Sequence, residues 1–151
     1  MSRKLEPELT AEMMELMPGG RACAVATVDA GGRPYLSLMA GVVAVEPSVI
    51  HLGCWAAGAT LANIGRAGVV TIETLGPRAI SIQCDARILK DVMDTSMFPP
   101  HPYALVEARV VSVKDDAPPT LKMSPLAFDY GAKQDAMELL ERDFMAEMTE
   151  L

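Results

Sequence analysis

The clearest pattern in the chain is the alternation of apolar and polar residues from Ile80 to Ile88. Successive side chains of a strand point to opposite faces, so this stretch predicts a strand with one face in a core and the other in water. A second strand is expected from Tyr103 to Lys114, where the apolar positions change parity near Val110-Val111. An extra residue produces such a change, so a β-bulge is expected there.

Four more apolar runs predict strands that are mostly buried. Short turn-forming sequences separate them, and Asp29-Ala30-Gly31-Gly32 in particular predicts a hairpin. Gly41 lies inside the longest run, where it indicates a bulge, a barrel corner or a close contact with a ligand. The four runs are Ala22–Val28, Tyr35–Val45, Val49–Trp55 and Val69–Leu75.

Both ends of the chain show helical spacing. The sequence after Thr10 predicts a short amphipathic helix at about residues 10–17, which Pro18-Gly19-Gly20 ends. A helical tail is expected at about residues 135–149, with acidic residues on the face away from its apolar stripe. Because an exposed stripe invites aggregation, it should pack on the barrel or on another subunit. The stripe consists of Met137, Leu140, Phe144 and Met148.

The segment between the third and fourth strands combines a turn of small residues with a short helix. Ala56-Ala57-Gly58-Ala59 has almost no side chain, so backbone amides there can approach a ligand closely. Thr60 is expected to cap the helix, and Gly65 and Gly68 are natural terminators. A helix N-terminus after such a turn favours a phosphate. The structural alternative is a tight connector whose small residues serve packing.

Six strands joined mostly by short turns predict a mainly β fold, an antiparallel barrel with peripheral helices. The 151 residues suit one domain spanning 1–151. Half of the residues are hydrophobic, but no apolar run is long enough to span a bilayer, so no membrane partner is expected. The net charge of −7 and the lack of a basic cluster argue against nucleic acid as a partner.

The cysteines and the N-terminus favour a cytoplasmic protein. An odd number of cysteines inside apolar runs (Cys23, Cys54 and Cys84) predicts buried, reduced thiols. The charged N-terminal sequence lacks the apolar centre of a signal peptide. His51 and Cys54 would point to opposite faces of a strand, so they make a poor metal pair and no metal is expected.

The order and spacing of these elements resemble the FMN-binding split β-barrel family, which includes pyridoxamine 5′-phosphate oxidase and small bacterial FMN-binding proteins. The pieces that carry the resemblance are ACAVATVDAGGRPYLSLM, GATLANIGRAGVVTI and ISIQCDARI, and the similarity spans roughly Ala11 to Asp115. The resemblance implies a six-stranded antiparallel split β-barrel that forms a homodimer. It also implies that FMN binds in a groove between the two subunits.

The same resemblance implies the cofactor-binding residues. The second strand would lie along the flavin ring and ribityl chain, the turn and helix start would hold the phosphate, and Trp55 would end its strand near the ring. Many members carry Ser, Arg and Lys in this turn, so here the amides, the Thr60 hydroxyl, or Arg66, Arg78 or Arg87 would have to compensate. The residues so implied are Ser37, Leu38, Met39, Ala40, Gly41, Trp55, Gly58, Ala59 and Thr60.

The expected function is that of an FMN-dependent oxidoreductase, in which the flavin transfers hydride or electrons and the protein positions it. No spacing indicates a nucleophile or an acid–base residue, so no catalytic residue is assigned. The partners would be a small-molecule redox substrate and an electron donor that the sequence does not specify. The alternatives are a deazaflavin or haem in the same groove, or a non-enzymatic flavin carrier or sensor.

Overall fold

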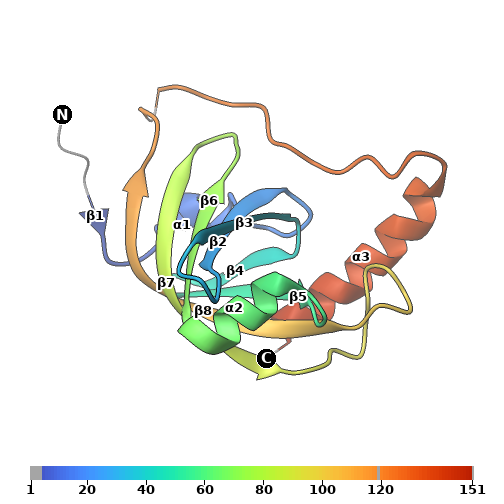
Figure 1. Cartoon of the computed structure of the whole chain (residues 1–151). Coiled ribbons are helices and arrows are strands. Elements are labelled where there is room, and N and C mark those ends of the chain that lie inside the picture. Colours follow the sequence, from blue (N-terminus) through green and yellow to red (C-terminus); the bar gives the residue numbers. More distant parts are fainter. Residues whose placement is uncertain (1–4, 119, 151) are drawn as a thin grey trace.

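In the part of the chain that the structure describes, eight strands form one antiparallel sheet that curls into a half-barrel, and three α-helices surround it (Figure 1). This computed structural model describes residues 5–118 and 120–150. The strand order is β3-β2-β6-β7-β8-β5-β4, and β1 pairs with β8. The strands are β1 (Leu5–Glu6), β2 (Cys23–Val28), β3 (Pro34–Met39), β4 (Val42–Glu46), β5 (Val49–Trp55), β6 (Val69–Thr74), β7 (Ile80–Lys90) and β8 (Tyr103–Asp115). The helices are α1 (Ala11–Met14), α2 (Ala59–Ala67) and α3 (Gln134–Thr149), with a 3-10 turn η1 (Gly131–Lys133) before α3.

The alternation predicted for β7 and the bulge predicted for β8 are both confirmed. Ile80, Ile82 and Cys84 are buried, whereas Gln83 and Asp85 between and beside them are exposed. Gln83 pairs with Ser112 and Cys84 pairs with Val110, so Val111 is the extra residue of the bulge. The predicted class, a mainly β antiparallel barrel with peripheral helices, is therefore correct.

The predicted number of six strands is wrong, chiefly because the run Tyr35–Val45 forms two strands. The backbone bends at Ala40 and Gly41, so β3 pairs with β2 while β4 pairs with β5 at the other end of the strand order. Gly41 is thus a barrel corner, one of the three roles its position suggested. The short strand β1, which pairs with the end of β8, supplies the other extra strand.

The boundaries of α1 and α2 differ from those expected. Thr10 caps α1 by accepting a hydrogen bond from the Met13 amide at 3.2 Å, but the α-helix ends at Met14. Gly58, not Thr60, is the N-cap of α2. Gly65 lies inside α2 and does not end it. Gly68, in the left-handed conformation with φ of +69°, provides the C-cap.

The hydrophobic core has two parts. The larger fills the half-barrel and is built mainly from aliphatic residues and methionines of α1 and the strands. The smaller lies beneath α3, where Phe144 and Met148 are fully buried and Leu140 is half-buried. The helix contacts β4 and β5, and a long segment after β8 leads around the barrel to it (Figure 1). The expectation that the tail packs on the barrel is confirmed.

The three cysteines are free and buried, as expected. Burial raises the pKa of each of these thiols to about 12, which keeps them protonated and unreactive. Within the described part of the chain, no helix has both the length and the apolar character that crossing a membrane requires.

Candidate functional site

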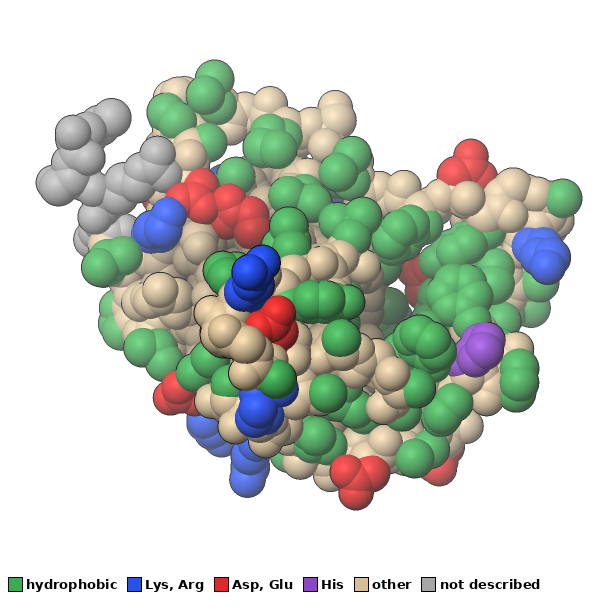
Figure 2. All heavy atoms as spheres, in the orientation of Figure 1, with side chains coloured by type: hydrophobic (Ala, Val, Ile, Leu, Met, Phe, Trp, Pro, Cys, Tyr) green, Lys and Arg blue, Asp and Glu red, His purple; other side chains and the backbone are tan. Residues whose placement is uncertain are grey.

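All nine residues implied as cofactor-binding line one cavity of about 460 Å³. This volume lies in the usual range for small-molecule sites. Figure 2 shows a hollow between the body of the barrel and the lobe at the right of the view, with hydrophobic side chains on both sides. The lining residues are Tyr35, Ser37, Leu38, Met39, Ala40, Gly41, Gly53, Cys54, Trp55, Gly58, Ala59, Thr60, Met97, Phe98, Tyr103, Phe128, Tyr130 and Phe144.

Two glycines allow the barrel and the tail to meet at the cavity. The Gly53 amide donates to the Gly41 carbonyl at 2.9 Å, which holds the barrel corner against β5. A Cβ on Gly53 would lie 2.6 Å from Phe144 Cε1 and 3.1 Å from Met148 Sδ. A Cβ on Gly41 would lie 3.2 Å from the same Phe144 atom. The Phe144 ring therefore packs directly on the backbone of both segments and forms part of the cavity wall.

The polar part of the cavity lies where β3 meets the start of α2. The hydroxyls of Ser37 and Thr60 are 2.6 Å apart and share a hydrogen bond. Gly58 has no side chain with which to cap the first amides of α2, and Gly58, Ala59 and Thr60 all line the cavity. The first amides of a helix have no partner inside it, so this end offers donors and the positive end of the helix dipole.

None of the described residues that line the cavity is charged. The three arginines considered as phosphate ligands are bound elsewhere. Arg66, in the last turn of α2, donates to the Val28 carbonyl and to Asn63 Oδ1. Arg78 pairs with Asp115, and Arg87 pairs with Glu107. Within one chain, an anion in this cavity would therefore be held by amides and hydroxyls alone.

The aromatic part of the cavity was not anticipated beyond Trp55. The chain has one tryptophan, three tyrosines and three phenylalanines, and all of them line this cavity. The main core cluster contains none of them. One sequence feature pointed this way. Phe98, Phe128 and Tyr130 lie outside the predicted strands and helices, although an aromatic core residue would be expected inside one of them. The Trp55 side chain is half exposed, and its ring lies edge-on to the His101 ring with the two ring centroids 5.7 Å apart.

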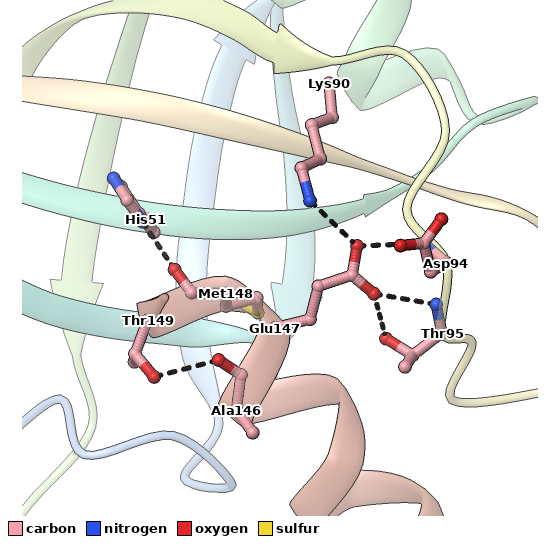
Figure 3. Close-up of polar contacts among 8 residues, drawn as sticks. All are labelled: His51, Lys90, Asp94, Thr95, Ala146, Glu147, Met148 and Thr149. Atoms are coloured by element: carbon pink, nitrogen blue, oxygen red, sulfur yellow. Dashed lines mark hydrogen bonds and ion pairs between the residues drawn. The ribbon is translucent and has the colours of Figure 1, made fainter. Parts of the chain in front are cut away.

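Polar contacts anchor α3 beside the cavity (Figure 3). The buried Glu147 carboxylate accepts hydrogen bonds from the Asp94 amide at 2.8 Å and from the Thr95 amide and hydroxyl at 2.7 Å each. Lys90 Nζ lies 3.3 Å from the same carboxylate. At the end of the helix, His51 Nδ1 is 2.6 Å from the Met148 carbonyl oxygen. The tail that carries Phe144 is thus fixed to both β5 and the loop after β7.

No cluster of three or more His, Cys, Asp or Glu side chains that could hold a metal ion occurs in the described residues. The groups that face the cavity are backbone amides, hydroxyls, a thiol, thioethers and aromatic rings. This set suits an organic ligand with a planar ring and a hydrogen-bonding chain.

Neither a protein-family model nor a curated protein sequence matches the chain. Solved structures do match. A candidate pyridoxamine 5′-phosphate oxidase from Lactobacillus delbrueckii is 21% identical, with a TM-score of 0.62 over 75% of this chain and 98% of that one. HupZ from Group A Streptococcus is 18% identical, with a TM-score of 0.60 over 77% and 98%. An F420 reductase is 14% identical, with a TM-score of 0.51 over 66% and 93%. The chain therefore has the split-barrel fold of the pyridoxamine 5′-phosphate oxidase-like proteins.

Proposed function

We propose that the protein is a flavin-binding redox protein, with FMN as its cofactor in the cavity between β3, β5 and α2, and that it acts as a homodimer. The observation that carries the proposal is that one cavity combines the paired hydroxyls of Ser37 and Thr60 and the first amides of α2 with the apolar end of β3 and the half-exposed Trp55 ring. The ring and the ribityl phosphate of FMN need these two kinds of surface.

The residues divide naturally between the parts of the cofactor. Ser37, Thr60 and the first amides of α2 would bind the phosphate and the ribityl hydroxyls. The strand from Leu38 to Gly41 and the half-exposed Trp55 would face the ring. When bound, the flavin supplies the hydride or electron transfer, and this chain's residues hold and orient it.

Fold-level similarity supports a flavin-type ligand without specifying one. One similar structure is a candidate pyridoxamine 5′-phosphate oxidase, and another is an F420 reductase, so a deazaflavin is the nearest alternative cofactor. The lack of a charged side chain at the cavity is compatible with turnover, because the flavin can perform the chemistry, and also with a non-enzymatic carrier or sensor.

The decisive experiment is a titration of FMN into flavin-free wild type and a Thr60→Asp variant. A carboxylate against the phosphate would cost on the order of several kcal/mol in a partly buried site, so flavin binding should be lost. The fold should persist, because an acidic residue in the first turn of a helix is favourable. The matched control is Ala62→Asp, which adds the same charge to an exposed position of α2 outside the cavity and should keep its affinity.

Equal affinities for wild type and Thr60→Asp would place the phosphate elsewhere, and no FMN binding by wild type would refute the cofactor. A visible spectrum of the purified protein distinguishes flavin, deazaflavin and haem. Reduction of the bound flavin by NADH or NADPH, followed by reoxidation with added acceptors, distinguishes an enzyme from a carrier.

A further inference from the structure

Three of the aromatic residues at the cavity form a cluster of their own. Phe98 comes from the loop after β7, and Phe128 and Tyr130 come from the segment before α3. The rings of Phe98 and Tyr130 lie 6.3 Å apart, edge to face, and those of Phe128 and Tyr130 lie 6.5 Å apart. We call Phe98, Phe128 and Tyr130 the aromatic cluster.

Two members of the aromatic cluster lie outside the core, whereas Tyr130 packs against the smaller part of the core beneath α3. Phe98 and Phe128 are each more than two-fifths exposed, and neither belongs to a core cluster. Exposed rings that line a cavity gain most when another flat apolar surface covers them, because stacking adds to the burial of area. The elements that carry the cluster are also separate from β3 and α2, which supply the polar groups assigned above to the flavin.

The cluster is held in place before any ligand arrives. Phe144 and Tyr103, which line the same cavity, pack edge to face at 5.0 Å, and Phe144 lies against the glycines of the barrel. Glu147 ties α3 to the loop that leads to Phe98. Contacts that hold a binding wall in position before a ligand binds lower the entropy cost of binding a planar molecule.

The cavity is also electrically neutral over a wide pH range. No lining residue among those described is acidic or basic. Burial raises the pKa of the Cys54 thiol to about 12, and it also raises the pKa of the Tyr103 and Tyr130 phenols. At the aromatic cluster, away from the first amides of α2, a charged group would lose hydration without gaining an ion pair, a cost that an uncharged ring does not have.

We propose that the aromatic cluster binds an uncharged, planar aromatic molecule as the second ligand beside the cofactor. The inference rests on the proposed flavin site, because it assigns the polar part of the same cavity to FMN. It goes further by naming the class of molecule that the protein would present to the flavin.

Calorimetric titration of the FMN-loaded protein with 2-naphthol, and with 2-naphthoate as its anionic counterpart, tests the proposal. We expect 2-naphthol to bind and 2-naphthoate to bind at least about tenfold more weakly. Phe128→Ala and Phe98→Ala should each weaken 2-naphthol binding by about threefold to tenfold and leave FMN affinity unchanged. The control is Leu126→Ala, which should change neither affinity, because Leu126 is an exposed apolar residue of the segment that carries Phe128 but does not line the cavity.

Several results would overturn the proposal: no binding of 2-naphthol, equal binding of 2-naphthoate, or a similar loss in Leu126→Ala. Displacement of FMN by 2-naphthol, or a parallel loss of FMN affinity in Phe98→Ala and Phe128→Ala, would show that the cluster holds the flavin itself. If wild type binds no FMN but the flavin-free protein binds 2-naphthol in a Phe128-dependent way, the proposed cofactor fails and the aromatic site stands.

Discussion

Gly53 shows how a single residue joins the barrel to its tail. It lies in the middle of a buried strand, where a glycine adds no packing and costs conformational entropy. The structure explains it by the position of Phe144, whose ring occupies the space that a Cβ would take. The sequence singled out Gly41 but not Gly53, because the residue that requires Gly53 lies far along the chain.

Gly53→Ala should destabilise the protein by about 1–3 kcal/mol, because the fully buried Phe144 and Met148 would have to move. The control is Gly65→Ala in the interior of α2, where a Cβ would meet only Ile88 Cδ1 at 3.7 Å. That change should stabilise the helix by about 0.5–1 kcal/mol. Urea unfolding monitored by circular dichroism measures both, and a neutral Gly53→Ala would mean that Phe144 does not pack there.

At the scale of elements, the sequence predicted what depends on neighbours along the chain. Strand alternation in β7, the bulge at Val111 and the Gly68 cap are local patterns, and all three are confirmed. Two of the errors arose where a residue distant in the sequence determines the local structure. The run from Tyr35 to Val45 divides because each half pairs with a different strand. Thr60 lies inside α2, and its hydroxyl shares a hydrogen bond with Ser37 instead of capping the helix.

The attachment of α3 is another such long-range feature, and it depends chiefly on the hydrogen bonds that the Glu147 carboxylate accepts. Burial alone raises the pKa of Glu147, but hydrogen bonds from Thr95, the Asp94 amide and Lys90 outweigh it, so the pKa lies below its usual value of 4.5. A carboxyl group with a lowered pKa in the folded state stabilises the fold above its unfolded-state pKa. The contribution of the Glu147 carboxylate to stability is therefore lost as the pH falls from about 4.5 through its lower folded-state pKa.

Glu147→Gln keeps the shape of the side chain but removes its charge, and its amide group would face donors. The loss of charge-assisted hydrogen bonds should cost about 1.5–3 kcal/mol near pH 7. The difference from wild type should shrink as the pH falls below about 4.5. Thermal unfolding from pH 3 to pH 7 measures this, with Glu150→Gln, an exposed carboxylate on the same helix end, as the control. An equal loss at every pH would argue against the ionised carboxylate as the anchor.

For the whole molecule, the sequence and its family resemblance predicted the split-barrel fold, and the structure brings the nine expected site residues to one cavity. The aromatic wall from the tail lay outside the resemblance, which ended near Asp115. No local pattern could place Phe128 and Tyr130 against β3 and α2, because the segment that carries them has no regular structure of its own. Long-range contacts position this segment: the Ala22 amide donates to the Leu126 carbonyl at 2.8 Å, Arg21 pairs with Ala127, and α3 is anchored beyond it.

The surface of β3 supports the proposed homodimer. This strand lies at one end of the strand order, so its outer side has no strand partner among the described residues. Leu36 is 71% exposed and Leu38 is 53% exposed, and they lie on the same face of the strand. Leu38 also lines the cavity, so a second copy that covered this face would also cover the proposed flavin site.

Leu36→Lys should therefore separate the subunits. Burying a leucine contributes about 1.5–3 kcal/mol, and a two-fold interface contains the residue twice, so dimer affinity should fall by about a hundredfold or more. Light scattering at micromolar concentration should give twice the 16.2 kDa chain mass for wild type and the single mass for the variant. Val111→Lys, at an exposed apolar residue of the β8 bulge, should remain dimeric.

A monomeric wild type would refute the dimer. A dimeric Leu36→Lys beside a monomeric Val111→Lys would move the interface to β8. Loss of FMN affinity together with dimer mass would show that the second subunit completes the cavity.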